Sequence, residues 1–365
     1  MRALFIEPFD VGSHASFRRS ITAGVVADWT ELTLPGRHWK WRMRGSAVWF
    51  AREHRAELEL GHDLLFASSY LPLVELHGLV PATAQIPSVL YFHENQLAYP
   101  IRREHGGSNY QFGFTQLVSA LAASAVVFNS EYNRSSFFEA AENLLKRMPD
   151  AVPASWLSEI QAKSLVLPLP LTLPDAAPDV LKNSELGPLI LWNHRWEFDK
   201  NPELFCDALE AIAARGVPFR VAFCGQRFRQ APDCFERARE ALGGRVVAFG
   251  HQPLEVYQSL LRRADIVAST AVHEFFGISI VEATHAGAMP LVPNRLAYRE
   301  TVRAEFRYAT DDEFEARLEA LCARYQAGEV LRADRRSFVA QFSAAQVLPR
   351  YEALIEGLVA SSPRP

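Results

Sequence analysis

Short apolar runs alternate with longer amphipathic segments along most of the chain, and this alternation restricts the fold more than any other feature of the sequence. In the first half the runs are Ala3–Ile6, Leu64–Ala67, Ser88–Phe92 and Ala125–Phe128. Each has the length of a buried strand and is followed by a turn and a segment with helical periodicity. This order predicts an α/β protein, in which a parallel sheet carries helices on both faces.

A second series of the same kind follows a proline-rich stretch. Five prolines lie between Leu167 and Pro188, at positions 168, 170, 174, 178 and 188, and predict a linker. The later runs are Leu189–Trp192, Arg220–Cys224, Val246–Phe249, Asp265–Ala268 and Met289–Val292. We therefore expect two Rossmann-like domains, at 1–175 and 189–343, with a linker at 176–188. By analogy with folds of this plan, a C-terminal helix within 344–365 is expected to pack back on the first domain.

Composition limits the classes of function. The 365 residues are 49% hydrophobic and 22% charged, with a net charge of −4, which is typical of a soluble globular protein and does not by itself indicate nucleic-acid binding. The four cysteines lack metal-ligand or redox spacing, which favours reduced thiols in the cytoplasm. The N-terminal apolar run ends at Glu7, too early for a signal peptide, and Leu117–Phe128 is too short to span a membrane.

Two glutamates eight positions apart follow the strand that ends at Ala268. Glu274 falls in a loop containing Gly277, and Glu282 falls about two turns into the next helix. A strand, a glycine loop and a helix place backbone N–H groups at the carboxyl edge of a sheet, where phosphate is favoured. The two carboxylates could accept hydrogen bonds from the hydroxyls of a sugar and of a ribose. Taken alone, however, the common spacing fits a loop glutamate and a solvated helix glutamate better.

A pair of cations follows the first strand of the second series. Arg195 and Lys200 lie in a loop that leads into a helix at Asn201–Pro202, where proline suits the first turn. A forked guanidinium and a compact ammonium suit a diphosphate. The alternative is two solvated surface cations.

Polar residues also follow three strands of the first half. Gly12, Ser13 and His14 come after the first strand, but G-x-G-x-x-G is absent, so no dinucleotide cofactor is expected. His93 follows the strand Ser88–Phe92, and a lone histidine is more often structural than catalytic. The next three residues, Glu94, Asn95 and Gln96, are candidates for contacts with the sugar or the acceptor. For Asn95, helix capping is an equally good alternative. Asn129 and Ser130, after the strand that ends at Phe128, fit an N-cap better than a site.

A basic segment between Arg37 and Arg55 holds six arginines or lysines against one acid, Glu53. Trp39, Trp41 and Trp49 lie among them. Cations alternating with aromatic rings can follow a phosphate backbone and stack on unpaired bases. The alternative is a solvated amphipathic helix whose tryptophans pack on the core. Arg102, Arg103 and His105 could extend such a surface.

The segment Val272–Gly287 resembles the nucleotide-sugar signature of retaining glycosyltransferases of family 4. The resemblance implies the GT-B fold, in which two Rossmann-like domains with parallel sheets face each other across a central cleft. It also implies that Glu274 and His93 contact the donor sugar, that Glu282 binds the ribose, and that Arg195 and Lys200 hold the pyrophosphate. With these residues the expected donor site includes Gly12, Phe275, Phe276, Gly277 and Ile278.

Elements of both halves, over roughly residues 3–300, are similar to a narrower group, the tRNA-queuosine α-mannosyltransferases. They are Gly12–His14, Leu34-Pro35 followed by Trp39-x-Trp41-Arg42, Leu65–Ser69, Tyr91–Gln96, Val127–Ser130, His194–Trp196 with Asp199-Lys200, and His273–Gly277. The similarity implies transfer of mannose from GDP-mannose to the cyclopentene diol of queuosine in the anticodon loop of tRNA(Asp). The expected acceptor contacts are Ser13, His14, Trp39, Trp41, Arg42, Arg44, Glu94, Asn95 and Gln96.

The implied mechanism is retaining transfer without a protein nucleophile, with Arg195, Lys200, His93 and Glu274 as the catalytic residues. Because no D-x-D motif suits a metal-bound diphosphate and a cationic clamp replaces the metal, we expect a metal-independent enzyme. We also expect no cofactor, and a monomer is the favoured oligomeric state. Loops near Gly225 and at Gly250–His251 are expected to select the base. Two alternatives remain at this stage: a family 4 enzyme with a lipid or polysaccharide acceptor, and a non-catalytic module that binds a nucleotide sugar or tRNA. The intact set of charged residues argues against the second.

Overall fold

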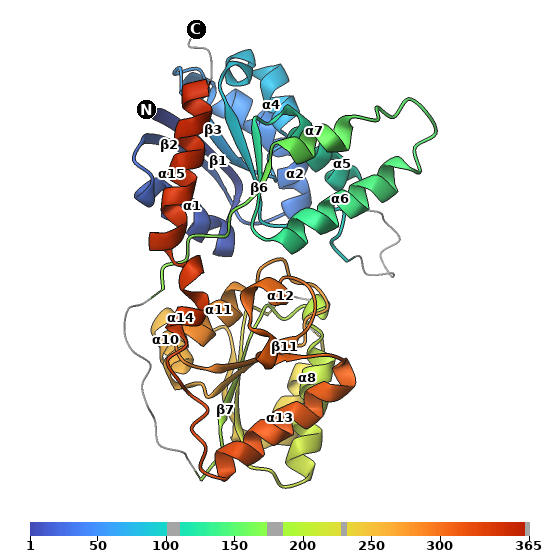
Figure 1. Ribbon diagram of the computed structural model, residues 1–365, viewed down its shortest axis with the longest axis vertical. Helices are drawn as coiled ribbons and strands as arrows, with labels where there is room; N and C mark the ends of the chain where they lie inside the picture. The colour runs from blue at the N-terminus through green and yellow to red at the C-terminus, as the bar shows by residue number, and fades with distance from the viewer. Residues whose placement is uncertain (101–109, 174–184, 228–231, 362–365) are drawn as a thin grey trace. The chain divides into compact units, whose positions relative to one another are not determined.

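The chain folds into two compact units in a computed structural model that describes residues 1–100, 110–173, 185–227 and 232–361 (Figure 1). The first unit comprises Met1–Thr172 together with the chain from Phe342 onward, and the second comprises Leu173–Gln341. Each unit is built on one parallel sheet, so the predicted α/β class with two Rossmann-like domains is confirmed.

The sheet of the first unit has six parallel strands in the order β2-β1-β3-β4-β5-β6. The strands are β1 (Arg2–Asp10), β2 (Asp28–Pro35), β3 (Leu64–Ser68), β4 (Ser88–Phe92), β5 (Ala125–Phe128) and β6 (Ser164–Val166). The four runs predicted from the sequence are β1, β3, β4 and β5. The two strands that were not predicted lie at the sheet edges, where partial exposure removes the continuous apolar pattern of a buried strand.

Helices cover both faces of this sheet (Figure 1). They are α1 (Gly12–Gly24), α2 (Trp39–Glu53), α3 (Arg55–Leu58), α4 (Leu73–Leu79), η1 (Pro81–Gln85), α5 (Tyr110–Ala122), α6 (Glu131–Leu145) and α7 (Trp156–Ala162). Side chains of β1 alternate between the faces: Leu4 and Ile6 join the core beneath α2, α4, α5 and α6. Phe5 lies on the other face and stacks on Phe66 with ring centroids 5.0 Å apart.

The last helix, α15 (Ala344–Ser361), completes the second face of the first unit beside α1 (Figure 1). Its Tyr351 is fully buried and donates hydrogen bonds to the carbonyls of Leu167 and Pro168, at 3.1 and 3.2 Å. The start of the proline-rich stretch therefore belongs to the first unit. The greater part of the predicted linker, 176–184, lies outside the described residues, as do Arg102, Arg103 and His105.

The sheet of the second unit also has six parallel strands, in the order β12-β11-β10-β7-β8-β9. They are β7 (Leu189–Asn193), β8 (Arg220–Cys224), β9 (Val246–Gly250), β10 (Ile266–Ala268), β11 (Met289–Pro293) and β12 (Arg307–Tyr308). All five predicted runs are strands, and the two-residue edge strand β12 is the one that the sequence did not indicate. The chain grows outward from β7 in one direction and then from β10 in the other. The loops after β7 and β10 therefore flank the switch point, where open α/β sheets bind ligands.

The second unit packs helices on both sides of its sheet (Figure 1). They are η3 (Phe198–Lys200), α8 (Pro202–Ala214), α9 (Cys234–Leu242), η4 (Gly243–Arg245), α10 (Leu254–Arg263), α11 (Ile278–His285), α12 (Tyr298–Thr301), η5 (Ala304–Phe306), α13 (Asp311–Gln326) and α14 (Arg336–Val339), with η6 (Ala340–Phe342) leading into α15. Ile190 and Trp192 face the core formed with α8, α9 and α13. Leu189 and Leu191 face the core formed with α10 and α11. These cores hold the strand ends of the switch point in fixed positions.

Candidate functional site

Two loops of the second unit are tied together at the carboxyl edge of the sheet, one after β7 and one after β10. The Thr270 hydroxyl lies 2.9 Å from the carbonyl oxygen of Lys200 and 2.8 Å from that of Asn201. The Val272 N–H donates to the Asp199 carbonyl at 2.9 Å. Asn201 has a left-handed backbone (φ 47°), and Pro202 begins α8 as predicted. The loop carrying Lys200 is thus locked against the loop carrying Glu274.

Lys200 lies buried between two carboxylates. Its ammonium is 3.2 Å from the Asp199 carboxylate and 3.2 Å from that of Glu274, and it donates to the His273 carbonyl at 2.8 Å. Its side chain is 8% exposed, whereas that of Arg195 is 52% exposed and forms an ion pair with Glu197 at 3.3 Å. The two cations predicted to clamp a diphosphate therefore occupy different surroundings. One is fixed inside the protein and the other is partly in solvent.

The charged groups of this cluster shift one another's pKa values. Burial by itself would lower the pKa of Lys200, but Glu274 and Asp199 raise it above its ordinary value. Burial would likewise raise the pKa of Glu274, but Lys200 and then His194 lower it to about 2. His194 has its pKa lowered to about 4, by burial and by the Lys200 charge, and is neutral at pH 7. The site thus holds a permanent ammonium and a permanent carboxylate.

The loop of Glu274 ends at the start of α11. Glu274 accepts a hydrogen bond from the Phe276 N–H at 3.2 Å, while Phe275 and Phe276 are buried. Gly277 has φ +88°, and a β-carbon there would lie 2.8 Å from the Tyr298 ring, so glycine is required on both counts. No side chain caps α11, which begins at Ile278. The N–H groups of its first turn face the carboxyl edge and can meet an anion.

Glu282 lies on α11, half-buried, and accepts a hydrogen bond from the Tyr257 hydroxyl at 3.3 Å. Asn193, at the end of β7, donates to that hydroxyl at 3.0 Å and to the Ser279 carbonyl at 3.0 Å. Burial raises the pKa of Glu282 to about 7, and the Tyr257 hydrogen bond opposes the rise. Glu282 therefore titrates near neutrality, unlike Glu274.

A cavity of about 370 Å³ in the second unit is lined in part by Asn193 and Tyr257. Gly225 on its wall has φ +157°, and a β-carbon there would lie 1.8 Å from the His194 carbonyl oxygen, so the wall can only be glycine. The lining combines the loops after β7, β8 and β9 with the start of α10: Asn193, His194, Arg195, Cys224, Gly225, Gln226, His251, Gln252, Leu254 and Tyr257. The loops expected to select a base thus lie around one cavity, next to Arg195.

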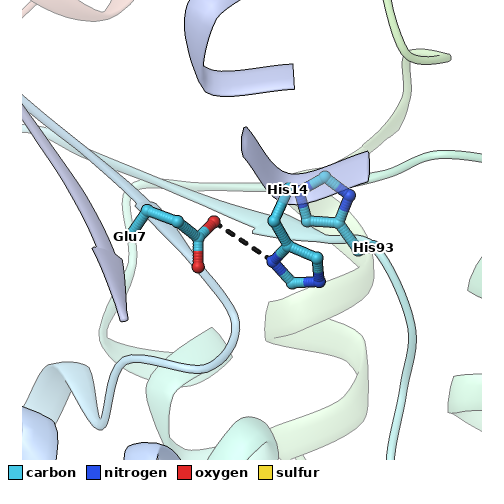
Figure 2. A group of neighbouring side chains, drawn as sticks. All are labelled: Glu7, His14 and His93. Atoms are coloured by element: carbon cyan, nitrogen blue, oxygen red, sulfur yellow. Dashed lines mark ion pairs between the residues drawn. The ribbon is translucent and has the colours of Figure 1, made fainter. Parts of the chain in front are cut away.

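The carboxyl edge of the first unit gathers a second buried cluster (Figure 2). His14, from the first turn of α1, is 3.2 Å from the Glu7 carboxylate and stacks on His93 with ring centroids 3.9 Å apart. Glu7, His14 and His93 are 0%, 4% and 6% exposed. Gly12 (φ +54°) and Ser13 lie nearer the surface, at the helix start.

The polar residues after His93 are engaged with the protein. Asn95 is fully buried, donates to the Asn133 side chain at 2.9 Å and accepts from the Ala98 N–H at 2.8 Å. Among the described residues no helix begins at Asn95, so its bonds are structural ties rather than a helix cap. The Gln96 N–H donates to Gln116 at 2.7 Å, whereas Glu94 is half-buried and accepts a hydrogen bond from the Tyr70 hydroxyl.

Ser130 is the N-cap of α6, where it accepts from the Asn133 N–H at 3.0 Å, as the sequence favoured. Asn129 donates to the His93 carbonyl at 2.7 Å. These two residues therefore hold the loop after β4 and the start of α6 in place.

The basic aromatic segment forms α2 and combines both alternatives drawn from the sequence. Trp39 is half-buried against Phe112 with ring centroids 5.3 Å apart, so it is a packing residue. Trp41 is 65% exposed and its ring lies over Gly45, whose added β-carbon would come within 2.7 Å of it. The exposed residues Lys40, Trp41, Arg44 and Val48 follow helical spacing along one side of α2, and the exposed Arg37 precedes the helix; we call these five residues the α2 stripe. Arg42 donates to the Pro35 carbonyl at 3.2 Å, and Arg44 to Gln111 at 3.2 Å.

Asp199, Tyr257 and Glu7 are among the residues of these clusters that were not predicted as site residues. Asp199 was noted only as part of a motif, and Tyr257 reaches Glu282 from a different helix, which no local pattern reveals. Glu7 did leave a signal, because an acid inside an apolar strand is costly unless it is paired.

The fold and the second-unit site define a glycosyltransferase of GT-B architecture. The structure resembles sucrose-phosphate synthase from Thermosynechococcus elongatus (TM-score 0.71, 15% identity, 99% of this chain and 100% of that one). It also resembles the Anabaena protein HepE solved with UDP and glucose (TM-score 0.65, 14% identity, 98% and 100%). A family model described as glycosyl transferases group 1 matches residues 176–329.

The chain belongs to the tRNA-queuosine alpha-mannosyltransferase family. The model of that family's N-terminal domain matches residues 2–171. A Drosophila melanogaster protein named tRNA-queuosine alpha-mannosyltransferase is 37% identical over 366 residues, covering 95% of this chain and 94% of its own length. None of the described helices is long and apolar enough to cross a membrane.

Proposed function

We propose that this glycosyltransferase moves mannose from GDP-mannose to queuosine in the anticodon loop of tRNA(Asp), with retention of anomeric configuration, in the cytoplasm and as a monomer. The observation that carries the proposal is the 37% identity to a tRNA-queuosine alpha-mannosyltransferase across both units. The charged cluster around Lys200 and Glu274 supports turnover rather than binding alone, because it supplies fixed charges of both signs at the switch point.

The donor fits the second unit as follows. The nucleobase and ribose enter the cavity beside Gly225 and His251, where Glu282 accepts hydrogen bonds from the ribose hydroxyls. Arg195 and the first turn of α11 receive the diphosphate, and the nearby Lys200 charge favours it. Glu274 and His93 contact the mannose. Stabilising the departing diphosphate is then the main electrostatic contribution to the rate, and no protein nucleophile or metal ion is required.

The acceptor fits the α2 stripe of the first unit. Among the described residues, Arg37, Lys40 and Arg44 form no ion pair with a protein carboxylate, so their charges remain for RNA phosphates. Trp41, whose exposed ring lies next to Gly45, offers an aromatic ring to an unpaired base. Glu94 and Ser13 are candidates for contacts with the cyclopentene diol.

The test is incubation of the purified protein with GDP-mannose, UDP-glucose or UDP-galactose and tRNA(Asp) with or without queuosine, followed by nucleoside mass spectrometry. We expect a hexose on queuosine from GDP-mannose only, with undiminished transfer in the presence of a metal chelator. Equal labelling of tRNA that lacks queuosine, or no labelling of any tRNA, would contradict the proposal. Transfer from a UDP-sugar would overturn the donor assignment alone.

A further inference from the structure

Glu7 is an acidic side chain in the carboxyl-terminal half of β1, the strand between β2 and β3, and is fully buried. One carboxylate oxygen accepts hydrogen bonds from the Phe9 N–H at 2.9 Å and from the Ser68 hydroxyl at 2.8 Å. The other lies 3.2 Å from His14 Nδ1 (Figure 2). Each oxygen of the buried side chain thus has a polar partner, two hydrogen-bond donors on one and the ion-pair contact with His14 on the other.

His14 is the counter-ion of Glu7. Burial by itself disfavours a charged ring, yet the adjacent Glu7 carboxylate and the more distant Glu94 raise the pKa of His14 to about 10. The Nε2 atom of His14 lies 4.0 Å from the Glu94 carboxylate, and the Tyr70 ring packs 5.1 Å away. His14 is therefore an imidazolium held between two acids, with Tyr70 and His93 as the other titratable groups beside it.

His93 stacks on that imidazolium, with an angle of 26° between the rings. Phe17 and Tyr91 meet its ring edge-on, at 5.1 and 4.8 Å. Neither ring nitrogen has a hydrogen-bond partner among the described residues, although the side chain is 6% exposed. Burial and the His14 charge hold the pKa of His93 well below its usual range. His93 is thus a neutral ring, fixed by stacking, whose two nitrogens remain for a ligand.

The same three side chains also place ligand atoms within 4.8 Å of one another, which is close enough to consider a metal ion. The ring geometry favours the ion pair instead. Nearly parallel stacked imidazoles direct their nitrogen lone pairs along separate planes rather than toward one centre, whereas a zinc site needs convergent ligands. The His14 nitrogen nearest to Glu7 already lies within ion-pair distance of that carboxylate, at 3.2 Å.

We propose that Glu7 is a positioning residue: it fixes His14 as an imidazolium, and this cation holds the stacked His93 ring in place as a neutral hydrogen-bonding group for the donor sugar. The last clause rests on the function proposed above. A neutral imidazole can both donate to and accept from sugar hydroxyls, whereas an imidazolium only donates. A glycosyl centre gains positive charge as its leaving group departs, so a charged His93 would oppose the reaction. The positive charge of His14 does not have this effect, because the adjacent Glu7 carboxylate compensates it.

The first test reads the charge states without any substrate. Protein labelled with ¹⁵N-histidine is titrated by NMR as wild type, Glu7→Gln and Ser68→Ala, with resonances assigned from His14→Gln and His93→Gln. In wild type we expect His14 to carry both protons at pH 8 and His93 to carry one. Glu7→Gln keeps the size of the side chain but removes its charge. The pKa of His14 should then fall by about one to three units, and that of His93 should rise. Ser68→Ala, which removes one bond to the other carboxylate oxygen, should leave His14 charged.

The second test measures transfer. Glu7→Gln should lower kcat about ten- to a hundred-fold, by analogy with the loss of a residue that orients a metal ligand, with little change in KM for the donor. The rate should also gain an inflection where His93 now titrates. Glu7→Asp, which keeps the charge, should recover most of the rate, and thermal unfolding of each variant confirms that it is folded.

Two results would overturn the proposal: a pKa of His14 in Glu7→Gln that is unchanged from wild type, or one equivalent of Zn²⁺ bound by wild type and lost in Glu7→Gln. Absence of transfer by the wild-type protein would refute the proposed function, while the NMR arm would still decide the charge assignment.

Discussion

At the scale of single residues, the most telling feature is that the two predicted phosphate-binding cations differ in burial. Lys200 is enclosed with Asp199 and Glu274, whereas Arg195 is half in solvent. Removing a buried charge leaves its partners uncompensated, but removing an exposed one does not. Equal effects on activity can therefore accompany unequal effects on stability.

We predict that Lys200→Met destabilises the second unit by about 3–5 kcal/mol, because two buried carboxylates lose their counter-ion. Arg195→Met is the matched control and should cost no more than about 1 kcal/mol. Both variants should lose transfer. Urea unfolding followed by tryptophan fluorescence measures the difference, and equal stability of the two variants would mean that Lys200 is not held by the acids.

Glu274→Gln tests the proposed sugar contact with little structural change. The amide keeps the size of the side chain and can still accept a hydrogen bond from the Phe276 N–H. We expect kcat to fall about 10²–10³-fold, in the range seen when one electrostatic contact at a reacting centre is removed. Single-turnover rates with pre-bound GDP-mannose check this. A variant with near-normal turnover would show that Glu274 is structural.

Donor affinity should depend on pH through Glu282. Its pKa of about 7 means that the carboxylate form, which we propose as the acceptor of hydrogen bonds from the ribose hydroxyls, is lost as the pH falls through 7. We expect the KM for GDP-mannose, whose diester phosphates do not titrate there, to decrease between pH 6 and pH 8. Tyr257→Phe removes the hydrogen bond that opposes the raised pKa, so the inflection should move to higher pH. Glu282→Gln should abolish it, and a flat wild-type profile would contradict the assignment.

At the scale of elements, helix α2 has one side that packs on the first unit and another that is exposed. Trp39 belongs to the core side, and Trp41 lies on the α2 stripe. We predict that Trp41→Ala weakens tRNA binding about five- to 150-fold, as expected for the loss of one stacked base. Stability should change by no more than about 0.5 kcal/mol, because the side chain is exposed. Filter binding and thermal unfolding measure the two effects.

Val48→Ala, on the same stripe but without a ring or a charge, serves as the control for Trp41→Ala and should bind tRNA normally. Donor hydrolysis without tRNA should be unchanged in both variants. Unchanged tRNA affinity in Trp41→Ala would exclude the stripe as the RNA surface.

At the scale of the whole molecule, the chain ends in the unit where it began. Tyr351 of α15 fills the space beside Phe17 of α1, with ring centroids 5.8 Å apart, and its hydroxyl holds the start of the proline-rich stretch. We predict that Tyr351→Ala destabilises the first unit by about 3–5 kcal/mol, as truncation of a buried aromatic side chain usually does. Hydrogen exchange should show lost protection in β1 and β3 with the second unit unchanged. Equal losses in both units would contradict this assignment of α15.

The sequence predicted nine of the twelve described strands, because buried parallel strands are apolar throughout and their period is local. It missed β2, β6 and β12, whose edge positions make them short or half-exposed. It also located the loops after β7 and β10, since Gly277 and Pro202 carry local backbone requirements that can be read from a single chain.

Long-range contacts were beyond the reach of the sequence. The sequence alone determined the α/β class and the two-unit plan, and it singled out the glutamate pair and the cation pair as candidates, because each depends on neighbours within about ten residues. Only the tertiary structure decided that Lys200 is buried and Arg195 is not, that Tyr257 bonds Glu282 across 25 positions, and that Glu7, His14 and His93 form one cluster from β1, α1 and the loop after β4. Burial and charge pairing depend on which strand ends the fold brings together, and strand order is a property of the packed sheet rather than of any local segment.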